Sequence, residues 1–207
     1  MKRTIIVTAL LLCTMTFSSC LFTLHPLFTA KDLTFDPRLA GSWKIDKEGS
    51  IATFERGTPA TFSKLPEAIQ QLAHKAYSVT VRNNEGVTEQ MYYAFLLRIG
   101  ANLYLDYFPA ETPRQQLYDS FYKQHFTPLH SMYKVRFNSD HSFDVCQFDK
   151  DYLDGLINKK QVRIHHETRY DGATLVTAST EELQQYVLKY GDVPQAYESA
   201  ATYERLQ

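Results

Sequence analysis

The segment AYSVTVRNNEGVTEQMYYAFLLRIGANLYLDYF, residues 76–108, carries the strongest structural signal in the chain. Three runs rich in β-branched and aromatic residues, 77–81, 87–99 and 103–108, are separated by short turns that contain Asn and Gly. The apolar and polar side chains of the first run alternate, which is typical of a strand with one buried face. Because such short turns join antiparallel neighbours, the segment predicts a three-stranded meander.

Similar signals recur on both sides of this meander. Further strands are predicted at residues 42–47, 50–56, 133–138, 142–148, 162–170, 173–178 and 202–206. Helices are predicted at 64–76, after Asp149 and after Ser179. The third helix is marked best, because Ser179 and Glu182 form a capping box and Gly191 supplies a stop.

This pattern of many short strands and few helices predicts a mainly β protein. A sheet of this size must close or split to protect its edges. We therefore expect a single antiparallel barrel, or a strongly curved sheet, with a C-terminal helix. A two-sheet sandwich is the alternative.

Composition supports one folded domain and excludes some function classes. The 207 residues are 44% hydrophobic and 14% aromatic, whereas a disordered chain has fewer aromatic residues. The formal net charge of −1 is unlike that of nucleic-acid-binding proteins, which carry strongly basic surfaces. We therefore expect no nucleic-acid partner.

The first twenty residues have the pattern of a secretory signal peptide. Lys2 and Arg3 precede a short apolar run at residues 5–13, and small residues follow. The apolar run is shorter than the roughly 20 residues that a membrane-spanning helix needs. The apolar run therefore fits a cleaved signal peptide better than a membrane-spanning helix.

Phe17-Ser18-Ser19-Cys20 resembles the lipobox of bacterial prolipoproteins. That resemblance implies cleavage before Cys20 and acylation of its sulfur and its new amino group. Two or three acyl chains suffice for stable membrane anchoring. The implied location is the bacterial cell envelope, on the periplasmic or surface side of the outer membrane. An ordinary signal peptide that is cut elsewhere is the alternative.

The chain then divides into a signal peptide at 1–19, a lipidated tether at 20–40 and one β domain at 41–207. The tether begins with residues 21–28, which are unusually apolar for a linker. They either lie at the bilayer surface or pack along the domain. In both cases the folded body is close to the membrane.

Gly41-Ser42-Trp43 resembles the G-x-W motif of lipocalins. In that family the Trp closes one end of the barrel and a C-terminal helix packs outside it. The extra helices of this chain depart from the family pattern. Segments such as Leu27-Phe28-Thr29 and residues 177–184 resemble uncharacterised bacterial lipoproteins, a likeness that implies no activity.

Motifs for catalysis and for metal or cofactor binding are missing from the sequence. We find no G-x-S-x-G, no H-E-x-x-H and no glycine-rich phosphate loop. His165 and His166 are adjacent, so on a strand they point to opposite faces. Cys146 lies in no recognisable motif. We therefore expect a protein that is not an enzyme and that has no cofactor and no metal site.

Aromatic residues are the remaining feature, and they admit two interpretations. In the first, the aromatic side chains line a pocket for an apolar ligand. In the second, some pack in the core and others cover the polar faces of the strands. Within the long connection 109–128, Tyr118, Phe121 and Tyr122 are candidates for contact with a ligand or partner. The other aromatic residues of this set are Tyr92, Tyr93, Phe95, Tyr104, Tyr107, Phe108 and Phe126.

The leading functional hypothesis is a lipid-anchored, non-catalytic binding module for a small apolar ligand. The alternative is a structural or assembly factor of the cell envelope that binds a protein partner.

Overall fold

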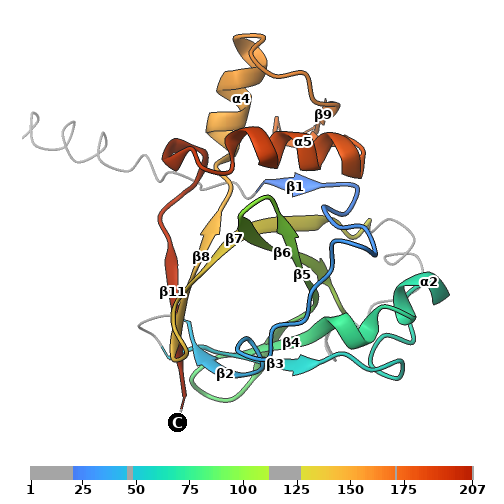
Figure 1. The fold of residues 1–207 in the computed structure, drawn as a ribbon, viewed down its shortest axis with the longest axis vertical. Coiled ribbons are helices and arrows are strands. Elements are labelled where there is room, and N and C mark those ends of the chain that lie inside the picture. The colour runs from blue at the N-terminus through green and yellow to red at the C-terminus, as the bar shows by residue number, and fades with distance from the viewer. Residues whose placement is uncertain (1–20, 46–48, 112–126, 171, 207) are drawn as a thin grey trace, which may run out of the picture.

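The fold is a closed antiparallel barrel of eight strands with a layer of helices and short strands against one outer wall (Figure 1). The computed structural model describes residues 21–45, 49–111, 127–170 and 172–206. The barrel strands are β2 (Gly41–Lys44), β3 (Ile51–Arg56), β4 (Ala76–Arg82), β5 (Thr88–Ile99), β6 (Asn102–Pro109), β7 (His130–Ser139), β8 (Ser142–Gln147) and β11 (Ala201–Arg205). The predicted barrel is thereby confirmed, and the sandwich is not adopted.

The barrel closes through pairings between distant parts of the chain. Strands β2 to β8 are neighbours in chain order, and β11 lies between β8 and β2. Strand β6 pairs with β7, with Leu105 opposite Tyr133. Strand β11 pairs with β2, with Arg205 opposite Trp43. The ring therefore has no free edge among its eight strands.

The outer layer extends from β7. Strand β1 pairs antiparallel with β7 and parallel with β10, and β10 pairs with β9. Figure 1 shows α5 above β1 and running in roughly the same direction, with α4 beyond it. The elements of this layer are β1 (Phe22–Thr23), α4 (Lys150–Asn158), β9 (His166–Thr168), β10 (Thr174–Val176), α5 (Thr180–Tyr190) and the 3₁₀ turn η3 (Pro194–Ala196).

Both helices of this layer begin where the sequence predicts, and a side chain caps each start. The Asp149 side chain accepts hydrogen bonds from the backbone N–H groups of Asp151 and Tyr152. Ser179 and Glu182 form the predicted capping box at the start of α5. These side chains satisfy N–H groups that have no partner inside the helix.

The helix predicted over residues 64–76 is broken into shorter pieces. Helix α2 covers only Glu67–Gln70, and the 3₁₀ turn η1 covers Ala73–Lys75. The chain then enters β4 directly, and Gly57 N–H donates to the Ala76 carbonyl. Leu65, Ile69 and Leu72 all pack against the outer core, but from successive turns rather than from one regular helix.

The apolar side chains form two cores that share the barrel wall. Trp43, Phe54, Leu96, Leu105 and Phe143 belong to the core inside the barrel. The core between the wall and the outer layer includes Leu27, Phe95, Leu97, Leu183 and Val187. Strand β5 contributes to both cores, which explains why its sequence is a continuous apolar run rather than a strict alternation.

Trp43 is a central residue of the core inside the barrel. Its ring is fully buried, its Nε1–H donates to the Leu39 carbonyl at 2.9 Å, and the Arg205 guanidinium lies 4.2 Å above the ring centroid. Arg205 also donates to the carbonyls of Ala40 and Arg38. The helix α5 outside the barrel is a fold feature that the lipocalin resemblance implies.

Residues 21–40 pack along the domain, the second of the two alternatives for this segment. Leu21, Leu27 and Leu39 are at most 2% exposed. Leu33 forms an isolated bridge with Leu97 of β5. The chain that follows Cys20 is therefore part of the folded body.

Candidate functional site in the barrel interior

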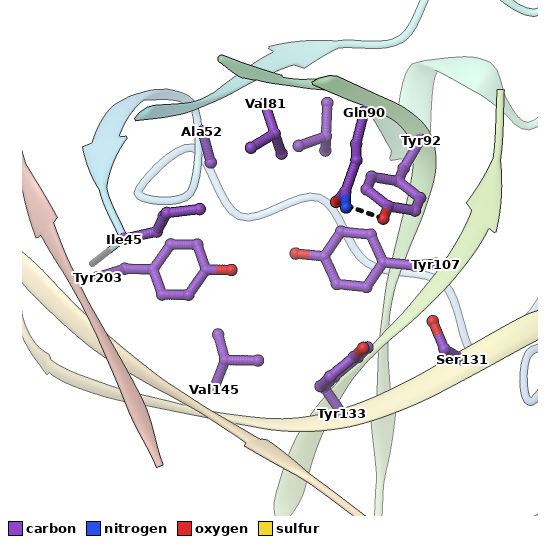
Figure 2. A pocket seen from close by; sticks show the side chains of 11 residues that line it. Ile45, Ala52, Val81, Gln90, Tyr92, Tyr107, Ser131, Tyr133, Val145 and Tyr203 are labelled. Carbon is purple, nitrogen blue, oxygen red and sulfur yellow. Dashed lines mark hydrogen bonds between the residues drawn. The ribbon is translucent and has the colours of Figure 1, made fainter. Parts of the chain in front are cut away.

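A cavity of about 140 Å³ lies inside the barrel (Figure 2). Its walls are mostly apolar, with tyrosine hydroxyls and two other polar side chains among them. The lining residues are Ile45, Ala52, Val79, Val81, Gln90, Tyr92, Tyr107, Ser131, Tyr133, Val145 and Tyr203.

Period-two alternation along the strands brings these side chains together. On β8, Phe143 packs edge-to-face against Trp43 with ring centroids 4.7 Å apart, and Val145, two residues further on, lines the cavity. On β7, Val135 belongs to the interior core, and Tyr133 lines the cavity. The cavity therefore begins where the packing around Trp43 ends.

Two tyrosine hydroxyls face one another across the cavity. Tyr107 and Tyr203 come from opposite sides, and Figure 2 shows their oxygens pointing toward each other. Within the described parts of the chain neither hydroxyl has a hydrogen-bond partner. Tyr92 differs, because its hydroxyl donates to Gln90 Oε1 at 2.6 Å. The cavity thus presents two uncommitted O–H groups.

Both hydroxyls keep their protons at neutral pH. Burial raises the pKa of Tyr107 well above its usual value, and the neighbouring tyrosines raise it further. Burial likewise raises the pKa of Tyr203 to about 12. At physiological pH the two groups are therefore hydrogen-bond donors and carry no charge.

A second buried polar group lies on the other side of the wall. Asp106 is fully buried, its Oδ2 accepts the Leu27 backbone N–H at 2.6 Å, and its Oδ1 lies 2.6 Å from His130 Nδ1. Burial raises the pKa of Asp106 against the opposing effect of these hydrogen bonds. Because Asp106 precedes Tyr107 on β6, it faces away from the cavity. It holds the N-terminal segment to the barrel.

The other candidates from the sequence do not assemble into a chemical site. His165 Nδ1 lies 2.6 Å from Glu182 Oε1, whereas His166 Nδ1 lies near the Ile164 carbonyl. Cys146 is half-buried, and burial raises the pKa of its thiol. In the part of the chain that the structure describes, no three His, Cys, Asp or Glu side chains cluster as metal ligands would.

The outcome differs among the aromatic residues that the sequence singled out. Tyr118, Phe121 and Tyr122, as well as Cys20, lie outside the described residues. Tyr92 and Tyr107 line the cavity, whereas Tyr93, Phe95 and Tyr104 belong to the outer core. The predicted aromatic set is therefore divided between cavity and core.

Sequence reasoning did not single out Tyr133 and Tyr203 as site residues. Each lies on a predicted strand, at a position whose side chain points into the barrel. The alternation along each strand identifies these two residues as neighbours in a site only when β7 and β11 are known to belong to the same ring.

Comparison with known proteins adds no identification: neither a family model, nor a curated protein, nor a solved structure matches this chain. Among the described residues, no helix has the length and apolar character to cross a membrane.

Proposed function

We propose that this protein is a lipid-anchored binding module of the bacterial cell envelope whose barrel holds a small ring-shaped ligand. The ligand class is a single aromatic or heteroaromatic ring that bears hydrogen-bond acceptors. The observation that carries the proposal is the barrel cavity, with the hydroxyls of Tyr107 and Tyr203 facing each other across it.

The size of the cavity limits the ligand. An apolar protein cavity of about 150 Å³ is known to accept benzene, and this cavity measures about 140 Å³. Pockets for larger ligands occupy roughly 300 to 1,000 Å³. A long acyl chain is therefore a poorer candidate than a single ring.

The lining supports an aromatic ligand with polar substituents. The Tyr107 ring already contacts the rings of Tyr92 and Tyr133 edge-to-face, with centroids 5.4 Å apart in both pairs, and aromatic ligands favour the same geometry. The hydroxyls of Tyr107 and Tyr203 add two donors. Neither hydroxyl has a partner in the described structure, so each is available to donate to an acceptor on the ligand, which gains affinity from the bond.

The anchoring part of the proposal rests on the lipobox at residues 17–20. With Cys20 acylated, the barrel is held at a membrane of the cell envelope. The alternative role, as a structural or assembly factor, has no specific support among the described residues.

Isothermal titration calorimetry with phenol, toluene and palmitate tests the ligand class. We expect saturable binding of phenol, weaker binding of toluene and none of palmitate. Tyr107→Phe and Tyr203→Phe should each weaken phenol binding by about fivefold, since each removes one hydrogen bond worth about 1 kcal/mol. Toluene binding should hardly change in either variant.

Tyr186→Phe is the matched control, because Tyr186 is a buried tyrosine of α5 in the outer core. It should leave the binding of all three probes unchanged. Saturable palmitate binding without phenol binding, or equal phenol affinity in the wild type and both cavity variants, would contradict the proposal.

A further inference from the structure

Leu21 and the end of β9 lie at the same edge of the small outer sheet. Strands β1 and β10 run parallel, with Phe22 paired with Leu175. Strand β9 runs antiparallel to β10, with Thr168 paired with Thr174. Chain entry at Leu21 and chain exit after Thr168 are therefore on one side, separated by two strand spacings, about 10 Å.

Cys20 is joined directly to the folded body, which begins at Leu21. Leu21 is 2% exposed and belongs to the outer core. Consecutive Cα atoms are about 3.8 Å apart, so any lipid on Cys20 starts within one residue of packed structure. The edge of the sheet at which Leu21 enters must then lie close to the bilayer.

Tyr170 projects from this same edge. Its side chain is 99% exposed, so it serves no packing role in the described fold. The backbone next to it is held, because the Arg169 N–H donates to Ala173 and the Gly172 N–H donates to Arg169. An aromatic ring with a polar tip is the type of side chain that is enriched at the membrane–water interface.

We propose that the tip of β9, defined by Arg169 and Tyr170, contacts the lipid bilayer and sets the orientation of the barrel on it. The occupant of this surface is the headgroup and glycerol region of the lipids, into which the Tyr170 ring inserts. This inference rests on the acylation of Cys20 in the proposed function. It adds a second, non-covalent contact about 10 Å from the anchor.

Fluorescence quenching on vesicles tests the contact. The acylated full-length protein carries Cys146→Ser to remove the remaining thiol, and Tyr170→Cys is labelled with an environment-sensitive dye. The protein is reconstituted into phosphatidylcholine vesicles with or without a lipid that bears a quencher at the headgroup level. We expect the dye at position 170 to lose about half of its emission or more when the quencher is present.

Val87→Cys provides the matched control. Val87 is 55% exposed and follows β4, away from the outer sheet. A dye at this position should keep nearly all of its emission. Quenching at position 170 but not at 87 supports the proposal.

The opposing outcomes separate the contact from the anchor. Protein that floats with the vesicles but shows no quenching at position 170, or equal quenching at both positions, overturns the contact and leaves the anchor intact. Protein that does not float overturns both. Phenol binding then shows independently whether the ligand part of the proposed function stands.

Discussion

Gly41 illustrates how a single residue serves the packing around Trp43. Its φ of +131° is a conformation that other residues rarely adopt, and a Cβ atom there would lie 2.6 Å from Arg205 Nη1. Arg205 must approach this closely to cover Trp43 and to bond to Arg38 and Ala40. The Gly of the G-x-W motif is thus required by both conformation and space.

We predict that Gly41→Ala lowers the free energy of unfolding by about 2–4 kcal/mol, as measured by urea denaturation. Gly86→Ala is the control, since Gly86 also has a positive φ of +78° but no atom lies within 4 Å of its added Cβ. That variant should lose only about 1–2 kcal/mol. Equal losses would show that the approach of Arg205 is unimportant.

The buried pair of Asp106 and His130 makes a second prediction at this scale. Asp106→Ala leaves the Leu27 N–H and the His130 ring without their partner, so we expect a loss of about 3 kcal/mol in unfolding free energy. Asp106→Asn keeps an acceptor for Leu27 and should lose less. Hydrogen exchange at the Leu27 amide should speed up in the Ala variant. Unchanged exchange there would contradict the clamping role.

At the scale of elements, α5 depends on its capping box. Ser179→Ala should lower the unfolding free energy by about 1 kcal/mol, because the Glu182 N–H at the helix start loses its acceptor. Ser179→Asp keeps an acceptor at this position and should restore most of the loss. Thermal melting followed by circular dichroism measures both variants. An equal loss in both would argue against the cap.

The elements that sequence reasoning predicted well are those with local signals. Asp149 and Ser179 mark helix starts through bonds to residues two and three positions away. The meander of β4 to β6 follows from turns of a few residues. In contrast, β1 consists of only two residues and depends on partners at 130–131 and 175–176. No periodicity can reveal such a strand.

The helix expected at 64–76 shows the opposite error. Its apolar spacing is correct, yet α2 is only four residues long. The outer core accepts those side chains from a looser path that also includes the buried ring of Phe62. Tertiary packing therefore overrides the local pattern.

At the scale of the whole molecule, the candidate site depends on barrel closure. Tyr107 is on β6 and Tyr203 on β11, and these strands lie on different sides of the ring. Alternation predicts that each side chain faces one side of its strand. Only the pairings of β11 with β8 and β2 place Tyr203 opposite Tyr107. The sequence shows both tyrosines, but it does not show that they face each other.

The many buried tyrosines predict alkaline unfolding. Burial raises the pKa of Tyr104 and Tyr203 to about 12, and raises those of Tyr77, Tyr107 and Tyr186 as well. In the unfolded chain their pKa is about 10. Because the folded pKa is the higher one, this stabilisation is complete below pH ~10 and is lost as pH rises through ~12.

Urea denaturation across this alkaline range, together with tyrosinate absorbance, checks that prediction. The midpoint should fall as pH rises above about 10, and tyrosinate should appear together with unfolding. Complete tyrosine ionisation in a protein that stays folded would contradict the burial of these hydroxyls.

The central claim is that the barrel interior is a binding site for a ring-sized molecule. Nuclear magnetic resonance of protein with ¹³C-labelled tyrosine rings, titrated with phenol, tests it most directly. The account predicts saturable shifts at Tyr107 and Tyr203, with Tyr186 of the outer core unmoved. Signals that do not shift, or shifts confined to outer-core tyrosines, would contradict it.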